Sequence, residues 1–225
     1  MVTAKIESVA LGVAAFFVLH QLVAFKNERK KKNEVTITLP DWAIEYFNSF
    51  DGKVFKSQEE MMAVAVEISK RNVDKDTGGP FGTAIYKVDK KTGESTLFSV
   101  GCNRVVSLGN STLHGETVAI QMAQKKLSTF SLREEDKEYH LYTSCEPCCM
   151  CLGATLWSGV SKMVCAATKD DAEAIGFNEG PVFPDSYKAL ESAGCKVVRK
   201  VLQKEGAAVL QHYGKVGVIY NADGS

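Results

Sequence analysis

Residues 143–151 read Thr-Ser-Cys-Glu-Pro-Cys-Cys-Met-Cys, and the expected organisation of the whole chain follows from them. Cys148 and Cys151 form a C-x-x-C pair directly after Pro147. Proline suits the first position of a helix, where its missing N–H is not needed, so the stretch predicts a helix from Pro147 to about Trp157. Side chains three residues apart project from one helix face, so the two thiols would face the same way and could bind one metal ion.

A second pair lies about thirty residues upstream, where His114 and Glu116 form an H-x-E pattern. The apolar residues at 118–123 predict a helix that starts near His114. One histidine and two thiolates leave the fourth position of a tetrahedral zinc site open, as catalytic zinc sites do. We therefore expect His114, Cys148 and Cys151 to bind Zn²⁺, with the Glu116 carboxylate beside the metal but not bound to it.

Simpler interpretations exist for each part of this pattern. A C-x-x-C pair alone is also found in redox sites and structural zinc sites, and a lone histidine is usually structural. The order of the four residue types, with the proline in place, favours a catalytic zinc site. Cys149 is turned by about 100° around the helix from Cys148, so it should not reach the same ion. We expect neither Cys149 nor Cys145 to be a ligand.

Composition limits the class of protein. A chain of 225 residues with 45% hydrophobic residues can bury one large core, and seven cysteines, an odd number partly clustered at one motif, do not form a typical disulfide framework. Residues 1–33 hold six basic and two acidic residues of the 27 of each kind, which leaves 21 basic and 25 acidic residues at 34–225, a net charge of −4. An acidic body argues against a nucleic-acid partner, because phosphate binding needs basic residues.

The N-terminal segment differs from the rest. Residues 6–25 are almost continuously apolar, and a basic cluster follows at 26–32. A cleavable signal peptide has its positive charges before the apolar run, so this order favours a retained membrane anchor through residues 6–25 with the catalytic domain in the cytosol. An amphipathic or partly buried helix is the alternative, since His20 and Gln21 interrupt the run. We divide the chain into an anchor with a basic cluster at 1–33, a linker at 34–56 and a catalytic domain with a C-terminal tail at 57–225.

Strands and helices alternate along the domain. Ser57 and Glu60 form a capping box before an apolar helical stripe. Further helices are expected at 41–47 with Asp41 as the cap, at 187–192 and at 205–212, while residues 33–39 are a strand or an extended linker. Strands are expected at 83–88, 97–103, 139–143, 162–167 and 196–201. This order predicts an α/β fold, a three-layer α/β/α sandwich around a mixed five-stranded sheet.

The motifs resemble those of a known family. Gly-Pro-Phe at 79–81, Asn-Arg at 103–104, His-Gly-Glu at 114–116 and the stretch 143–151 are similar to the cytidine deaminase-like superfamily. Within it, the segments 157–181 and 217–221 resemble guanine deaminases. The resemblance covers about residues 57–222. One departure is Gly115, where many relatives carry alanine, and another is Cys149 in place of a bulkier residue.

The resemblance implies a role for each matching residue. Asn103 would hydrogen-bond a purine base, Phe81 would line or stack on it, and the tail around Tyr220 would close the pocket. Glu116 would move protons to and from water, and Glu179 would assist proton transfer to the leaving amine. The implied reaction converts guanine into xanthine and ammonia, and the resemblance also implies a homodimer.

Other interpretations stay open at this point. Asn103 suits a turn after a strand, Phe81 suits the core, and Glu179 lies among residues typical of a solvated loop. The alternative functions are a tRNA adenosine deaminase, a cytosine or nucleoside deaminase, and a zinc module without catalytic activity. The intact Glu116 argues against the last of these, because a structural zinc site has no use for a base.

Overall fold

The computed structural model describes residues 33–221. Contacts divide the chain into Met1–Thr38 and a compact unit that begins at Leu39. Residues 34–38 carry no regular helix or strand, so this segment is not the strand that we had considered. The remainder of the expected linker, from Leu39 onwards, belongs to the compact unit. Within residues 33–221 no helix has the length and apolarity needed to cross a membrane, and the predicted anchor at 6–25 lies outside the described residues.

The elements of the compact unit alternate as the sequence predicts. In chain order they are α2 (Asp41–Asn48), β1 (Val54–Phe55), α3 (Gln58–Asp74), β2 (Gly82–Asp89), β3 (Ser95–Cys102), α4 (Val105–Leu108), α5 (Gly115–Leu127), β4 (Lys137–Cys145), α6 (Cys149–Ser158), β5 (Lys162–Ala167), α7 (Lys169–Glu173), α8 (Pro184–Ser192), β6 (Lys196–Val198) and α9 (Gln203–Val216).

The strands form one mixed sheet in the order β1-β3-β2-β4-β5-β6. The pairs from β1 to β4 are antiparallel, whereas β4, β5 and β6 run parallel. The sheet thus has six strands, and the predicted number of five was wrong by one edge strand. That strand, β1, has two residues and pairs Val54 with Thr96. Two residues are too few to show an alternating pattern in the sequence.

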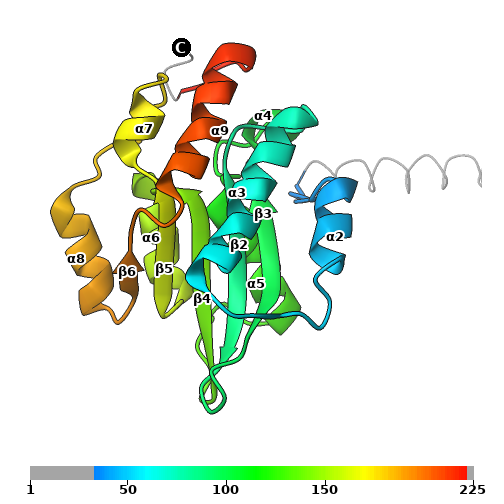
Figure 1. Ribbon diagram of the computed structural model, residues 1–225, viewed down its shortest axis with the longest axis vertical. Coiled ribbons are helices and arrows are strands. Elements are labelled where there is room, and N and C mark those ends of the chain that lie inside the picture. The colour runs from blue at the N-terminus through cyan, green and yellow to red at the C-terminus, as the bar shows by residue number, and fades with distance from the viewer. Residues whose placement is uncertain (1–32, 222–225) are drawn as a thin grey trace, which may run out of the picture. The chain divides into compact units, whose positions relative to one another are not determined.

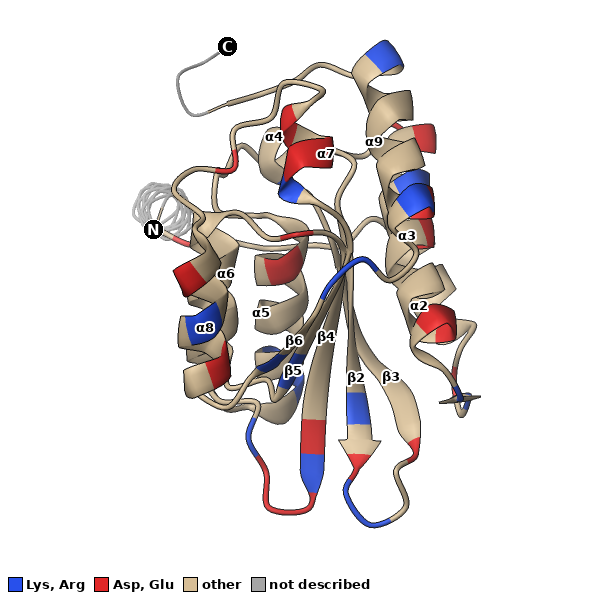
Figure 2. Ribbon diagram, turned by 60° about the vertical axis from the view of Figure 1, so that its left-hand side comes forward, with Lys and Arg blue, Asp and Glu red and all other residues tan. Residues whose placement is uncertain are grey.

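Helices cover both faces of the sheet, which confirms the α/β fold. Figure 1 shows α3 and α9 in front of the sheet, and Figure 2 shows them with α2 on one side and α5, α6 and α8 on the other. Neighbouring residues of β2 point to opposite faces, as a strand requires. Ile85 packs under α5 and α6, whereas Ala84 and Tyr86 pack under α3. Two apolar cores therefore lie on either side of the sheet.

Two expected helix caps differ in detail from the structure. Ser57 caps α3 and accepts a hydrogen bond from the Glu60 backbone N–H at 3.1 Å. The Glu60 carboxylate, however, accepts from the backbone N–H of Lys56. Asp41 is the first residue of α2 and does not cap it, because the N-cap is Pro40.

The helix expected from Pro147 begins two residues later. Cys148 is its N-cap, with the extended backbone angles φ −63° and ψ 172°, and Cys149 is its first residue. Pro147 thus precedes the cap. With this shift, Cys148 lies just before the first residue of the helix and Cys151 lies in its first turn. Both thiols are therefore still at the helix N-terminus.

A close contact fixes where α5 lies against the sheet. At Gly101 of β3, an added Cβ would lie 2.2 Å from the carbonyl oxygen of Gly115 and 2.4 Å from the backbone nitrogen of Ala119. Only glycine allows this approach. The N-terminus of α5, which carries His114 and Glu116, is thereby held against the end of the sheet.

Candidate active site

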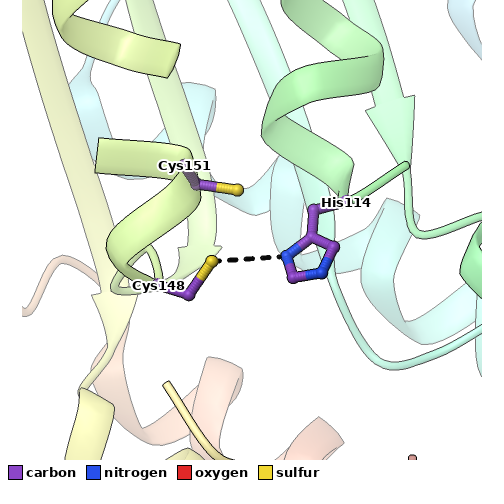
Figure 3. Close-up of side chains that lie close together, drawn as sticks. All are labelled: His114, Cys148 and Cys151. Atoms are coloured by element: carbon purple, nitrogen blue, oxygen red, sulfur yellow. Dashed lines mark hydrogen bonds between the residues drawn. The ribbon is translucent and has the colours of Figure 1, made fainter. Parts of the chain in front are cut away.

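The three expected metal ligands come together at the N-termini of two neighbouring helices. His114 is the N-cap of α5, and Cys148 is the N-cap of α6. Their ligand atoms and that of Cys151 all lie within 4.8 Å of one another. Figure 3 shows the three side chains close together at the two helix ends. The Sγ atom of Cys148 lies 3.5 Å from Nδ1 of His114. Zinc bonds of about 2.3 Å to sulfur and 2.0 Å to nitrogen, at a tetrahedral angle, separate the two atoms by about 3.5 Å, so the donor set fits zinc.

The surroundings favour a thiolate at one of these ligands. Hydrogen bonding from the Cys151 thiol, followed by His114, lowers the pKa of Cys148 to about 4, although burial opposes the shift. Burial lowers the pKa of His114, but the Cys148 thiolate raises it more, so that the net shift is upward. The N-terminus of a helix adds to the preference for negative charge at Cys148.

The two other cysteines of the motif lie elsewhere. Cys149 is exposed, and Cys145 is buried with its Sγ atom 3.4 Å from the carbonyl oxygen of Thr168. Among the described residues, neither belongs to the group of metal-ligating side chains around His114. That Cys149 and Cys145 are not ligands stays a prediction, which their positions outside this group support.

Glu116 is buried beside the ligand group. It lies in the first turn of α5, and its Oε1 accepts a hydrogen bond from the Thr143 hydroxyl at 3.1 Å. Burial raises the pKa of Glu116, and the nearby Cys148 thiolate raises it further. A carboxyl group with a raised pKa is suited to accept and return a proton near neutral pH.

A second carboxyl group, Glu179, lies in the same cavity. It sits in the segment between α7 and α8, and its carbonyl oxygen accepts a hydrogen bond from the backbone N–H of Cys149 at 3.1 Å. The residue is 6% exposed, so it is not part of a solvated loop. Burial raises the pKa of Glu179 to about 8, and the negative charges of Cys148 and Glu116 contribute to the increase.

The cavity has a volume of about 200 Å³ and opens at the end of the sheet. Seven of the eight predicted site residues line it, namely Phe81, Asn103, His114, Glu116, Cys148, Glu179 and Tyr220, and Cys151 adjoins it through the ligand group. No lysine or arginine is among the described residues that line it. The cavity therefore suits a small, uncharged ligand.

Two buried polar atoms in the cavity wall lack a hydrogen bond within the described part of the chain. They are Nδ2 of Asn103 and the hydroxyl oxygen of Tyr220. The Oδ1 atom of Asn103 accepts from the backbone N–H of Val105 at 3.2 Å, which leaves the amide donors for another partner. Buried polar groups are rarely left unpaired, so these atoms indicate a polar ligand.

Aromatic rings form the apolar part of the wall. Phe177 contacts Phe81 edge to face at a centroid distance of 5.0 Å and Tyr220 at 5.4 Å. The sequence analysis did not single out Phe177, although it lies two residues before Glu179. Further lining residues that it did not single out are Val105, Ser111 and Asn178.

The C-terminal tail is tied to the loop that carries Glu179. Oδ1 of Asn221 accepts from the backbone N–H of Asn178 at 2.9 Å, and its Nδ2 donates to the carbonyl oxygen of Gly176 at 3.0 Å. Nothing in the sequence pattern relates these segments, because 43 residues separate Asn178 from Asn221.

Glu146 also lines the cavity, but its carboxylate is already bonded. It accepts hydrogen bonds from the backbone N–H of Lys169 at 3.0 Å and from the Arg199 side chain. These bonds engage both oxygens of the Glu146 carboxylate with neighbouring groups.

Comparisons with known proteins agree with this geometry. Residues 55–167 match the model of the cytidine and deoxycytidylate deaminase zinc-binding region. A guanine deaminase from Bacillus subtilis is 33% identical over 60% of this chain and 80% of its own. A solved guanine deaminase from Nitrosomonas europaea is 36% identical with a TM-score of 0.74, covering 81% of this chain and 97% of its own. Another similar structure, solved with 2,6-diaminopurine, is 37% identical with a TM-score of 0.74, covering 85% of this chain and 99% of its own.

The family model spans half of the chain and includes the helix N-termini that carry His114, Cys148 and Cys151. The expected family and fold are thereby confirmed. The chain belongs to the cytidine and deoxycytidylate deaminase zinc-binding family and is a zinc-dependent deaminase.

Proposed function

We propose that this protein hydrolyses guanine to xanthine and ammonia. The observation that carries the proposal is the presence of two buried carboxyl groups, Glu116 and Glu179, in one small cavity beside the ligand group. The similar structures support a purine, because one is a guanine deaminase and another holds 2,6-diaminopurine. The absence of lysine and arginine from the described cavity wall favours a free base over a nucleotide or tRNA.

The cavity can hold such a base. Its volume of about 200 Å³ lies below the ~300–1,000 Å³ of pockets for drug-sized ligands. Phe81 and Phe177 offer ring surfaces, and Nδ2 of Asn103 can donate to an acceptor on the purine. In this proposal the Tyr220 hydroxyl, which lies beside the Asn103 side chain, also binds the base, and the tail closes the cavity.

Zinc held by His114, Cys148 and Cys151 would supply a hydroxide nucleophile by lowering the pKa of water towards neutrality. Glu116 accepts the proton from the water that attacks C2 of guanine and passes it to the ring nitrogen. The C2–N bond of the amino group then breaks, and Glu179 assists the transfer of a proton to the leaving amine. One water is consumed, and xanthine and ammonia are released.

The two carboxyl groups test the proposal. Glu116→Gln keeps the shape of the side chain but cannot accept a proton, and positioned proton transfer is worth about 10²–10⁴-fold in rate. We expect guanine turnover to fall by this factor with zinc retained. Glu179→Gln should also reduce turnover of guanine, whereas Glu173→Gln, an exposed control on α7, should have little effect. The measurements are ammonia release, zinc content and melting temperature.

The same assay separates the alternatives. Ammonia release is compared for guanine, guanosine, adenine, cytosine, cytidine and ammeline, and a gel shift tests tRNA. An active Glu116→Gln protein would exclude this mechanism. Loss of activity in Glu116→Gln alone would retain a deaminase but remove the role of Glu179 at the purine.

We also propose a homodimer and a membrane anchor for the full chain. Trp157 on α6 is 83% exposed and Phe130 is 86% exposed, which favours a partner surface on this side of the sheet. The support for the anchor is the apolar run at 6–25 followed by the basic cluster at 26–32.

A further inference from the structure

A buried asparagine on α3 connects two parts of the cavity wall without lining the cavity. Asn72 is 0% exposed. Its Nδ2 donates to the carbonyl oxygen of Asn103 at 3.0 Å and to the carbonyl oxygen of Gly79 at 2.8 Å. Asn103 carries the unpartnered side-chain amide of the cavity. The Asn72 side chain therefore holds the backbone of the residue that we propose to bind the base.

Gly79 lies in the loop before β2, and this loop packs against Tyr220 of the C-terminal tail. A Cβ added at Gly79 would lie 2.3 Å from the Tyr220 hydroxyl, and a Cβ at Gly78 would lie 2.1 Å from the carbonyl oxygen of Asn103. The loop therefore packs tightly between Asn103 and Tyr220. Asn72 thus binds both Asn103 and the loop residue Gly79, which lies against the Tyr220 hydroxyl.

The third hydrogen bond of the Asn72 amide comes from Thr77. Oδ1 of Asn72 accepts from the Thr77 hydroxyl at 2.8 Å. The same hydroxyl lies 3.4 Å from the carbonyl oxygen of Asn72, which is a second acceptor for its one proton. With two donors and one acceptor engaged, the amide has a single satisfied orientation, because a flipped amide would place its oxygen against two carbonyl oxygens.

Trp42 of α2 selects the direction of the Thr77 hydroxyl. Its indole Nε1–H donates to the Thr77 oxygen at 3.0 Å. The hydroxyl thus accepts from Trp42 and gives its proton to Asn72. Trp42 lies outside residues 55–167, the part of the chain that matches the family model.

We propose that Trp42, Thr77 and Asn72, here called the Trp42 relay, are positioning residues that hold the Asn103 amide at the angle needed for substrate binding. Helix α2 then contributes to substrate recognition through hydrogen bonds, although no residue of α2 lines the cavity. This inference rests on the proposed function, since it assigns substrate binding to Asn103.

Trp42 and Thr77, the two members of the relay that lie farther from Asn103, are the residues to replace. Replacement of Asn72 would remove two buried hydrogen bonds, and only the Gly79 carbonyl would keep a partner, the backbone N–H of Phe81. Such a variant would lose stability for reasons unrelated to positioning. Trp42→Phe removes the N–H and keeps a ring, and Thr77→Val removes the hydroxyl and keeps the shape. Tyr46→Phe is the matched control, since it removes a hydroxyl from the same helix and keeps the ring that Arg71 covers at 4.1 Å.

A double-mutant cycle distinguishes positioning from a merely structural role. Trp42→Phe and Thr77→Val are each made with Asn103 present and in an Asn103→Ala background, and kcat/KM for guanine is measured with melting temperature as a control. We expect about a tenfold loss when Asn103 is present and almost none in Asn103→Ala, because residues that act through one another are not additive. The loss should appear mainly in KM. Equal losses in both backgrounds, or a similar loss in Tyr46→Phe, would overturn the proposal.

A second measurement does not depend on the reaction. The side-chain amide signals of Asn103 are followed by nitrogen-15 NMR of the full chain and assigned by their loss in Asn103→Ala. Trp42→Phe and Thr77→Val should shift or broaden these signals, and Tyr46→Phe should not. If Trp42→Phe and Thr77→Val move the amide signals of Asn72 but leave those of Asn103 in place, the relay does not position Asn103. If the unmodified protein releases no ammonia from guanine, the proposed function fails, and the NMR result still decides whether the relay exists.

Discussion

His114 and Cys148 occupy the same position, the N-cap, of two adjacent helices. The backbone N–H groups at a helix N-terminus have no partner within the helix and favour negative charge. Cys148 and Cys151 lie at such an end, which lowers the cost of holding thiolates inside the protein. Glu116 is placed in the first turn of the other helix, so its carboxylate lies close to the ligands without replacing one of them.

The ligand assignment predicts the metal content of variants. Cys148→Ala, Cys151→Ala and His114→Ala should each lose zinc and activity, because a site of four positions uses these three side chains and water. Cys149→Ala and Cys145→Ala should keep about one zinc per chain, since both thiols lie outside the ligand group. Elemental analysis of the purified variants measures this, and loss of zinc from Cys149→Ala would show that the assignment is wrong.

The pKa of Glu179 predicts how stability depends on pH. The group titrates near 4.5 in the unfolded chain and near 8 in the folded protein. Between these values the folded state keeps a proton that the unfolded state has lost, so this group makes the free energy of unfolding fall as pH rises from 4.5 to 8. We therefore compare the free energies of unfolding of the zinc-free Glu179→Gln variant and the zinc-free unmodified chain. Their difference should shift in favour of the variant as pH rises from 4.5 to 8.

Urea unfolding of both proteins between pH 5 and 8.5 measures the difference. Bound zinc offsets the negative charge of Cys148, so the dependence should be weaker in the zinc-loaded protein. A stability difference that does not change with pH would show that Glu179 has an ordinary pKa.

At the scale of elements, the position of α5 and α6 against the sheet decides the site. The first residue of α6, Cys149, lies two residues beyond the expected start, because Cys148 is the extended N-cap and Pro147 lies before it. The N-terminus of α5 is held by the close approach of Gly101 to the helix backbone. Packing of helix on strand, and not the local sequence preference alone, brings the two helix ends within bonding distance of one ion.

Replacement of Gly101 by alanine should disturb this arrangement. Its Cβ would meet the backbone at Gly115 and Ala119, and overpacking of this kind costs about 1–3 kcal/mol. We expect a lower melting temperature and weaker zinc binding. Gly153→Ala on α6 is the matched control, because an added Cβ there has no atom within 4 Å, and alanine in a helix gains about 0.5–1 kcal/mol over glycine. Equal effects of the two changes would contradict the role of the close approach.

For the whole molecule, the cavity lies where the sheet ends and several loops meet. Phe81 precedes β2, Asn103 follows β3, and Cys148 follows β4. The tail after α9 adds Tyr220. Figure 1 shows these ends at the same side of the sheet. A mixed sheet with helices on both faces supplies a rigid base for groups that lie far apart in the sequence.

The proposed dimer has a test at Trp157. This side chain is 83% exposed on α6, and a charged residue would be costly to bury in an interface. Trp157→Glu should shift the protein from dimer to monomer in sedimentation, with zinc content unchanged. A monomeric unmodified protein would contradict the proposed dimer.

The proposed anchor predicts the effect of a truncation. Without residues 1–33, the protein should leave the membrane fraction and keep the turnover rate of the full chain, since the described site residues all lie beyond residue 80. Cell fractionation and ammonia release measure the two effects. If the full chain is soluble without detergent, the anchor prediction is wrong.

The sequence was sufficient for the family and the α/β class, and its short motifs pointed to the three residues of the ligand group. The spacing of Cys148 and Cys151 agrees with their place at one helix N-terminus, whereas the approach of His114 depends on how the two helices pack. The site roles of Glu179, Asn103 and Tyr220 stay predictions, although the structure brings these residues to one cavity. The edge strand β1 left no local signal.

The contacts that complete the cavity depend on tertiary structure. The bonds between Asn221 and the loop at 176–178, the edge-to-face packing of Phe177, and the hydrogen bond from Trp42 to Thr77 each join segments that no periodic pattern relates. Such contacts arise only when separate elements pack on one sheet, and their geometry depends on the close approach that glycine permits at a few positions. Short sequence motifs therefore determine which chemical groups the site contains, whereas the packing of distant segments determines the shape of the cavity.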